Sequence, residues 1–455
     1  MKQLKLIYLL FFIIIMYACK ESTDLNKTII SGFIKNSKID SLILYDKDYK
    51  PIKTIHLKKD NTFIDTVVIP KGYYFIGDMR ILTEMFLKPE DKLSITINYN
   101  ENIPKYSFLG IGAKENNYLQ RKRLYNKKFK NITNYKYFLN LSESDFLKLA
   151  DSINITKIDF LKSQVNLDKD FKFYELFVVE NENASLLNQY RRWRGEFLKN
   201  KDFKVSENYP NPYKNINVSN KKLLEHPKYM QCIKDFISYK MENVNSKDET
   251  LTTLEIIDKE IKNQKVKDEL TFEIIKSAIS QTKMLDEVYT KFNSIEKNHL
   301  YKNEIRKMYL KLKKISKGTT SPMFELHDIN DKLFRIRDLN GKLIYIDIWA
   351  TWCIPCVREI PALKKLEEDL KNRDIYFVSI CTSDTKERFK KMVKERKLGG
   401  IQLFAPDDDI PFFKEYFLNE IPRYILIDKE GKIIDANAYK PSNPKLKELI
   451  LKNLN

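Results

Sequence analysis

Two cysteines, Cys353 and Cys356, stand three positions apart in the stretch WATWCIPC, residues 349–356. Such a pair can be a redox-active dithiol, half of a zinc site, or two unreactive core thiols. A structural zinc site needs further Cys or His ligands at a comparable spacing. The sequence offers no second Cys pair nearby, and its four histidines are scattered. We therefore expect no metal at this pair.

The local pattern around the two cysteines favours a redox pair. The apolar run 343–349 predicts a buried strand, and Pro355 opens a predicted helix over 355–371. Proline suits the first turn of a helix because its missing N–H would be unpaired there anyway. Cys353 would then lie at a helix amino terminus, where unpaired N–H groups and the helix dipole stabilise a thiolate. Cys356 follows one turn later, within reach for a disulfide, so we expect no cofactor beyond this pair.

A carboxylate interrupts the apolar strand before the cysteines. Asp347 stands in the middle of the run 343–349. Burial disfavours the charged form of a carboxyl group and raises its pKa, which suits a group that accepts a proton from a thiol. The alternative is an Asp at a solvent-facing edge of the sheet.

Strands and helices alternate in the part of the chain that contains these residues. After a predicted linker at 317–322, we predict strands at 343–349, 375–381, 424–427 and 433–436, and helices at 355–371, 384–396 and 444–454. This alternation predicts an α/β layer that ends in a hairpin.

The preceding 300 or so residues have two different patterns. Short strand-like runs separated by Asn, Asp, Gly and Pro fill residues 27–112 and predict an all-β, antiparallel sandwich or barrel. Residues 113–316 have helical periodicity, with Ser142 as a helix-capping residue. Trp193 stands among three arginines in this region and is either a surface contact or, as we favour, the anchored aromatic of an ordinary helix face. The chain is thus predicted to be multidomain.

The amino terminus has the pattern of a secretory signal. Two lysines precede an uncharged run, residues 6–18, that is shorter than the roughly 20 residues needed to span a bilayer. The run ends at Cys19 in a pattern that resembles a bacterial lipobox. We therefore predict a signal peptide at 1–18, lipidation of Cys19, and a linker at 19–26. A plain signal peptide or an uncleaved anchor is the alternative, and each of these places the chain outside the cytoplasm.

The charge of the chain points to no nucleic-acid partner. The formal net charge is +19, but the lysines are spread along the chain and interleaved with acidic residues. Binding to nucleic acid is expected to need a basic patch or stripe. We interpret the excess as a solvated, lysine-rich surface.

The carboxy-terminal motifs resemble the thioredoxin superfamily, and specifically its TlpA-like, membrane-tethered protein disulfide reductases. Besides WATWCIPC, the resemblance rests on Pro361, on Ile421 and Pro422 before the strand 424–427, and on the lead-in 321–326. It covers about residues 317–455 and implies a thioredoxin-like fold there.

The resemblance also implies roles for single residues. Cys353 would attack a substrate disulfide, Cys356 would resolve the mixed disulfide, and Asp347 would accept the proton of Cys356. A cis-proline at Pro422 would present the backbone of Ile421 to an extended substrate. The structural prolines would be Pro355 and Pro361, and the residues lining the site would be Trp349, Trp352 and Ile354.

The expected function is reduction of protein disulfides in the periplasm by a membrane-anchored lipoprotein. The expected partners are disulfide-containing proteins, a membrane thiol that donates electrons, and the membrane itself through the lipid. Two alternatives remain. The pair could act as a disulfide oxidase or isomerase, because direction depends on the redox potential. The front of the chain could instead be a binding or scaffold module, for a protein or a glycan, with the redox domain secondary.

Overall fold

The structure, a computed structural model, describes residues 26–37, 39–78, 82–99, 105–242, 244–406, 410–418 and 420–454. Cys19 and the predicted signal peptide lie outside the described residues. The chain divides into two compact units: one runs to Val244 and includes Glu260–Val266, and the other comprises Asn245–Lys259 and the chain from Lys267 onward. The division of the sequence into domains at residues 112 and 316 stays a prediction. No helix of the described ranges is both long enough and apolar enough to cross a bilayer.

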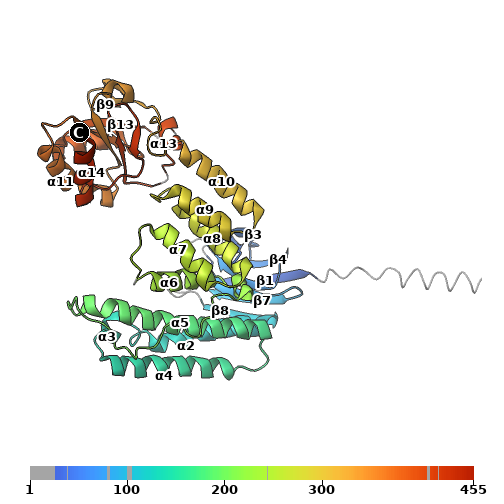
Figure 1. The fold of residues 1–455 in the computed structure, drawn as a ribbon. Coiled ribbons are helices and arrows are strands. Elements are labelled where there is room, and N and C mark those ends of the chain that lie inside the picture. Colours follow the sequence, from blue (N-terminus) through green and yellow to red (C-terminus); the bar gives the residue numbers. More distant parts are fainter. Residues whose placement is uncertain are drawn as a thin grey trace, which may run out of the picture. The chain divides into compact units, whose positions relative to one another are not determined.

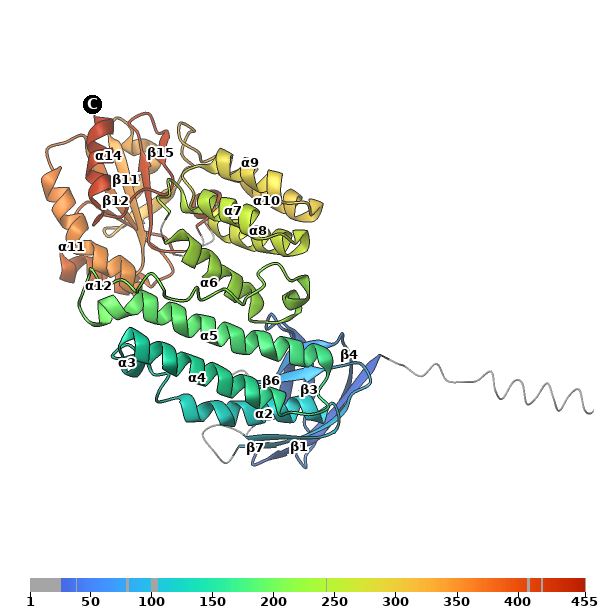
Figure 2. The same ribbon diagram turned by 60° about the horizontal axis from the view of Figure 1, so that its bottom comes forward.

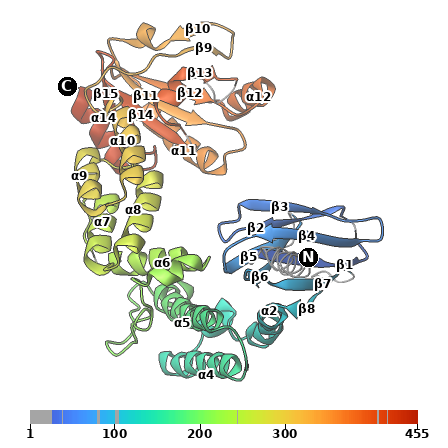
Figure 3. The same ribbon diagram turned by 90° about the vertical axis from the view of Figure 1, so that its right-hand side faces the viewer.

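The first unit begins with two β-sheets, which can be followed in Figure 3. One has the strand order β4-β1-β7-β8 and the other β3-β2-β5-β6. The bounds are β1 (Lys27–Lys35), β2 (Ser41–Tyr45), β3 (Pro51–His56), β4 (Thr62–Val68), β5 (Gly72–Gly77), β6 (Leu82–Leu87), β7 (Lys92–Asn98) and β8 (Lys105–Ile111). Alternate residues of both sheets, such as Ile30 and Leu44, share one core.

The prediction of an all-β sandwich is confirmed by these packed sheets, but the expectation of purely antiparallel pairing is wrong. Strands β1 and β7 pair in parallel, with Ile30 beside Leu93. Antiparallel neighbours can be joined by a hairpin, whereas parallel neighbours need a crossover. Here the strands of the second sheet lie between β1 and β7 in the sequence and supply that crossover.

Helices complete the first unit. They are α2 (Ala113–Asn126), α3 (Tyr135–Phe138), α4 (Glu143–Lys162), α5 (Lys169–Phe197) and α6 (Tyr229–Met241), with short 3₁₀ turns η1 (Lys127–Phe129) and η2 (Lys221–Glu225). The hydroxyl of Ser142 accepts a hydrogen bond from the backbone N–H of Asp145 at 3.1 Å, as a capping residue does. Helix α5 lies between α4 and α6 in all three views (Figures 1, 2 and 3).

The second unit contains four helices that precede a mixed sheet: α7 (Glu249–Glu260), α8 (Gln264–Ala278), α9 (Leu285–Ile295) and α10 (His299–Lys313). The sheet has the order β10-β9-β13-β12-β11-β14-β15. Its strands are β9 (Glu325–Asp328), β10 (Leu333–Arg335), β11 (Leu343–Trp349), β12 (Ile375–Cys381), β13 (Ile401–Phe404), β14 (Arg423–Ile427) and β15 (Ile433–Asp435). Its helices are α11 (Ile354–Asp369), α12 (Lys386–Arg396), α13 (Pro411–Glu415) and α14 (Pro444–Leu454), with the turn η3 (Ile336–Leu339).

Both faces of this sheet are buried, which explains the continuous apolar run of β11. Tyr345 faces the core formed with α11 and α14. Ile346, one residue on, faces the opposite core, which also contains Ile279 and Phe292 of the preceding helical segment. Strand β11 is the inner strand that pairs in parallel with β12 and antiparallel with β14. The expected α/β layer with a closing hairpin is confirmed.

The segment predicted as a linker is instead packed against strand β15. The N–H of Gly318 donates to the carbonyl oxygen of Ile433 at 2.7 Å, and that of Ser321 donates to Gly431 at 2.9 Å. Glycine, threonine and proline in this segment therefore form a hydrogen-bonded turn. The prediction of a linker at 317–322 is wrong.

Substituting Gly32 by alanine is expected to destabilise the first unit. A Cβ at Gly32 would lie 2.0 Å from the carbonyl oxygen of Ile95 on the paired strand. Relieving such a contact requires a backbone shift, which costs about 1–3 kcal/mol of unfolding free energy. Denaturant unfolding followed by far-ultraviolet circular dichroism measures this loss.

Gly72→Ala is the matched control, since a Cβ there meets no atom within 4 Å. Equal shifts of the unfolding midpoint in both variants, or a Gly32→Ala shift within the experimental scatter of the wild type, would contradict the predicted clash.

Candidate redox site

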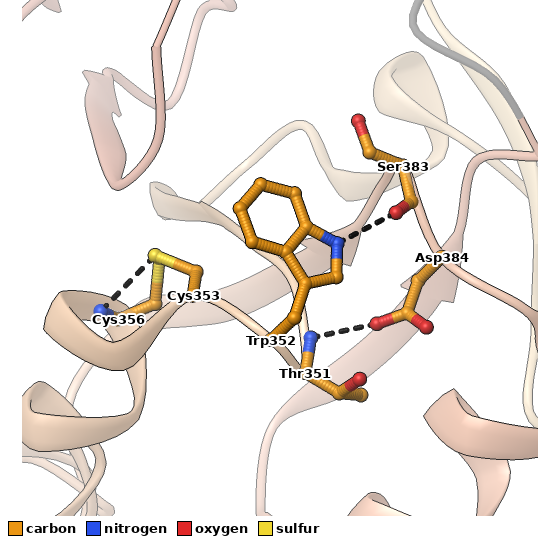
Figure 4. The surroundings of a disulfide bond; sticks show 6 residues. All are labelled: Thr351, Trp352, Cys353, Cys356, Ser383 and Asp384. Carbon is orange, nitrogen blue, oxygen red and sulfur yellow. Dashed lines mark hydrogen bonds between the residues drawn. A yellow bond between two sulfur atoms is a disulfide. The ribbon is translucent and has the colours of Figure 1, made fainter. Parts of the chain in front are cut away.

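The two cysteines lie at the junction between strand β11 and helix α11. Cys353 is the amino-terminal capping residue of α11, and Pro355 lies in its first turn. Cys353 and Cys356 form a disulfide with their Cα atoms 5.3 Å apart. The backbone N–H of Cys356 also donates to Sγ of Cys353 at 3.3 Å (Figure 4). A helix N–H therefore points at the sulfur that the sequence predicts to be the nucleophile.

The turn before Cys353 is held by the loop that follows β12. The indole N–H of Trp352 donates to the carbonyl oxygen of Ser383 at 2.7 Å, and the backbone N–H of Thr351 donates to Oδ2 of Asp384 at 2.7 Å (Figure 4). The other carboxylate oxygen of Asp384 accepts from the N–H of Thr385 at 2.8 Å. Two contacts thus fix the approach of the chain to the first cysteine.

Asp384 was not predicted as a site residue, because the predicted helix over 384–396 begins with it. The structure begins α12 at Lys386, with Thr385 as its capping residue. Asp384 is therefore free of the helix and available to the neighbouring turn. The signal was the pair of possible capping residues, Asp384 and Thr385, of which only one can cap.

The disulfide lies in a small apolar cluster beside an exposed apolar surface. Cys353 and Cys356 are only 4% and 5% exposed, whereas Trp352 and Ile354 are 56% and 64% exposed. The predicted lining residue Trp349 is buried beneath them in the same cluster as the cysteines. Of the three predicted lining residues, Trp352 and Ile354 thus offer a surface to a substrate, and Trp349 packs behind.

Two of the predicted prolines have the expected local geometry. The peptide bond between Ile421 and Pro422 is cis. Ile421 is half-buried and packs against the cluster that contains both cysteines. Pro361 lies inside α11. The structure therefore brings the segment around Pro422 to the disulfide, as the resemblance implies.

Asp347 lies on the face of β11 that the helix α11 covers, since it alternates with Tyr345. The residue as a whole is half-buried, but its Oδ1 is shielded from solvent and has no hydrogen-bond partner among the described residues. Burial raises the pKa of Asp347 to about 7, and the charges of Glu359 and Glu367 on α11 act in the same direction. A carboxyl group with this pKa can both accept and release a proton near neutrality.

Two further residues share the surroundings of Asp347 and were not predicted. Glu359 accepts from the N–H and the hydroxyl of Ser442, at 2.8 and 2.9 Å, and pairs with Lys440 at 3.3 Å. Tyr424 stands opposite Asp347 on β14, and burial, followed by the charge of Asp347, raises its pKa. Glu359 stands three residues after Cys356, which places both residues on the same side of the helix. This spacing could have predicted that Glu359 lies near the site.

A loop of the preceding helices also reaches this region. Nε2 of Gln281, between α8 and α9, donates to Oε1 of Glu420 at 2.6 Å. Glu420 directly precedes Ile421. Lys283 of the same loop pairs with Asp435 of β15. The sequence gives no sign of these two contacts, because the residues that form them are far apart in the chain.

Comparisons with known proteins match the carboxy-terminal part of the chain. The Redoxin family model matches residues 316–450. The thiol-disulfide oxidoreductase ResA of Bacillus thuringiensis subsp. konkukian is 28% identical over 144 residues, which are 32% of this chain and 82% of the relative. ResA of Bacillus cereus is 29% identical over 122 residues, 27% of this chain and 69% of the relative. A solved thioredoxin domain of a Bacteroides vulgatus thiol-disulfide oxidoreductase is 26% identical, covering 31% of this chain and 99% of that domain, with a TM-score of 0.29.

Asp347→Asn is expected to stabilise the oxidised protein at alkaline pH. The pKa of Asp347 rises from 3.8 to about 7 on folding. The folded state thus holds this proton more tightly than the unfolded chain, and stability is lost as pH rises from about 4 to about 7. Asparagine cannot ionise, so the unfolding free energy of the variant minus that of the wild type should be about 2–3 kcal/mol larger above pH 8 than near pH 4. This gain is smaller than the full pKa shift would give, because Asp347 is only half-buried.

Denaturant titrations of both proteins at several pH values measure this difference. Asp374→Asn removes an exposed carboxylate that pairs with Lys342 at 3.3 Å, and serves as the control with little change at either pH. An Asp347→Asn gain that is equal at acid and alkaline pH would show that ionisation is not its cause.

Proposed function

Residues 316–450 belong to the thioredoxin superfamily and have thiol–disulfide oxidoreductase activity, and on this premise we propose that the chain reduces disulfides of proteins outside the cytoplasm. The signal-like run and the lipobox-like Cys19 support a membrane-tethered lipoprotein in the periplasm. The observation that carries the proposal is the contact between the N–H of Cys356 and Sγ of Cys353 at 3.3 Å.

The proposed reaction starts from the reduced pair. The thiolate of Cys353 attacks one sulfur of a substrate disulfide, and the other substrate sulfur leaves as a thiolate. Cys356 then loses its proton to the carboxylate of Asp347 and attacks Sγ of Cys353. The second substrate sulfur leaves, takes up a proton, and the Cys353–Cys356 disulfide remains. The substrate has gained the two electrons that the dithiol has lost, and a membrane thiol donor resets the pair.

The exposed surface beside the sulfurs supports a flexible protein segment as substrate. Trp352 and Ile354 are apolar and more than half exposed. Ile421, next to the cis-proline, would offer its backbone to an extended chain, in the way that peptides add to an open edge. The exposed apolar pair and a backbone edge together favour a locally unfolded polypeptide over a small thiol.

Cys353→Ser is expected to abolish reduction of insulin by dithiothreitol through this protein, because serine supplies no thiolate. Cys356→Ser should instead accumulate mixed disulfides between Cys353 and its substrates, which non-reducing gels show and dithiothreitol releases. Cys232→Ala, which removes a buried thiol of the first unit, is the control and should retain activity. Insulin reduction by Cys353→Ser at the wild-type rate would contradict the assigned nucleophile.

The redox potential decides the direction of the reaction. The redox potential of a reductase should lie near the value of about −270 mV found for thioredoxin, whereas that of a strong oxidant lies near about −120 mV. Titration of the intact protein against glutathione or dithiothreitol, with the free thiols measured by alkylation, gives this potential. A value close to that of the strong oxidants would replace the reductase with the oxidase alternative while leaving the catalytic pair intact.

A further inference from the structure

The first unit contains a groove that the redox chemistry does not use. A hollow of about 300 Å³ lies along α5, with lining residues also from α4 and from Lys228 just before α6. A second hollow of about 150 Å³ shares Asn181, Ser185 and Gln189 with the first. The two form one continuous surface, here called the α5 groove. Ligand pockets commonly begin at about 300 Å³, so the α5 groove is large enough for a small polar ligand.

The α5 groove has amide side chains with unused hydrogen-bonding capacity. Asn154 of α4, with Asn181 and Asn183 of α5, line it, and these three side chains have no hydrogen-bond partner among the described residues. Oδ1 of Asn154 is also shielded from solvent. Buried polar atoms without partners are rare in folded proteins, because each has lost its bonds to water without replacement. In this groove the argument applies to Oδ1 of Asn154, while the half-buried amides of Asn181 and Asn183 can both donate hydrogen bonds to a ligand and accept them.

An exposed tryptophan extends the groove at one end. Trp193 lines the smaller hollow and is 44% exposed. The guanidinium carbon of Arg192 lies 5.0 Å from the centre of its ring, which helps to fix the ring's orientation. The structure therefore favours the surface-contact alternative for Trp193 over an anchored aromatic of a helix face.

The charges of the groove are largely balanced. Lys157 pairs with Glu182 at 2.7 Å inside the larger hollow. The smaller hollow is lined by one carboxylate, Asp235, and one guanidinium, Arg192, and Lys228 also lines the larger hollow. A strongly charged ligand would therefore meet like charge as well as opposite charge in each hollow. A neutral ligand with many hydroxyl groups does not, because amides and hydroxyls can both donate and accept.

The helical setting argues against a peptide in the groove. Addition of an extended peptide needs an open strand edge, and docking of a peptide helix needs a row of apolar anchor pockets. The α5 groove is formed mainly by helices, and most of its lining residues carry amide, hydroxyl or charged groups. The flat indole ring at its end suits the C–H face of a sugar ring. We propose that the α5 groove binds a neutral glycan, a function separate from thiol–disulfide exchange.

The test is titration of the full chain with cellohexaose, maltohexaose, hexa-N-acetylchitohexaose and mannohexaose by isothermal titration calorimetry. At least one sugar should bind saturably. Asn181→Ala and Trp193→Ala should each weaken that binding by about tenfold or more, since each removes a direct contact. Insulin reduction by these variants should stay at the wild-type rate, and thermal unfolding shows whether they remain folded.

Asn140→Ala is the matched control, because Asn140 is an exposed amide of the same unit outside the groove. Gln189→Ala, an exposed groove position, repeats the test if Asn181→Ala does not fold. The proposal is overturned if none of the four sugars binds saturably, if groove variants bind like the wild type, or if an unfolded peptide such as reduced, carboxymethylated insulin B chain occupies the groove in place of sugar.

Discussion

The contact between the N–H of Cys356 and Sγ of Cys353 depends on a helix starting immediately after a buried strand. The amino terminus of α11 can favour a thiolate only if the sulfur stays over its unpaired N–H groups. Strand β11 fixes the position where the helix begins. It pairs with β12 on one side and β14 on the other, and both of its faces pack against apolar cores. The hydrogen bond from the backbone N–H of Thr351 to Asp384 further restricts the turn between strand and helix.

Two electrostatic influences act around the pair. The helix terminus favours negative charge at Cys353, whereas Glu359 and Glu367 of the same helix disfavour negative charge at Asp347. With a pKa of about 7, Asp347 need not carry its charge while the thiolate forms, and it can take the proton that Cys356 releases later. Glu359 is kept in place by Ser442 and Lys440, so its effect on Asp347 depends on the chain segment before α14.

How far the sequence predicts this arrangement depends on whether the signal is local. Strands β11 and β12 and helix α14 were predicted with their observed bounds, because an apolar run or a proline start marks each of them. Strand β3 has little local signal of its own: its first four residues are exposed, so the alternation that identifies a strand is absent. Asp384 was missed for a different reason, since its role comes from Thr351, 33 positions away.

The helices before the redox domain show the same limit more strongly. No local pattern could reveal that Ile279 and Phe292 share a core with Ile346 and Ile425 of the sheet. The rear face of that sheet is therefore completed in part by α8 and α9, and the loop joining these helices reaches Glu420 through Gln281, 139 positions away. Because Glu420 precedes the segment that packs beside the disulfide, this hydrogen bond connects the loop to the surroundings of the redox centre. The helices of the second unit thus serve the redox centre, while the α5 groove lies on elements that do not contribute to its core.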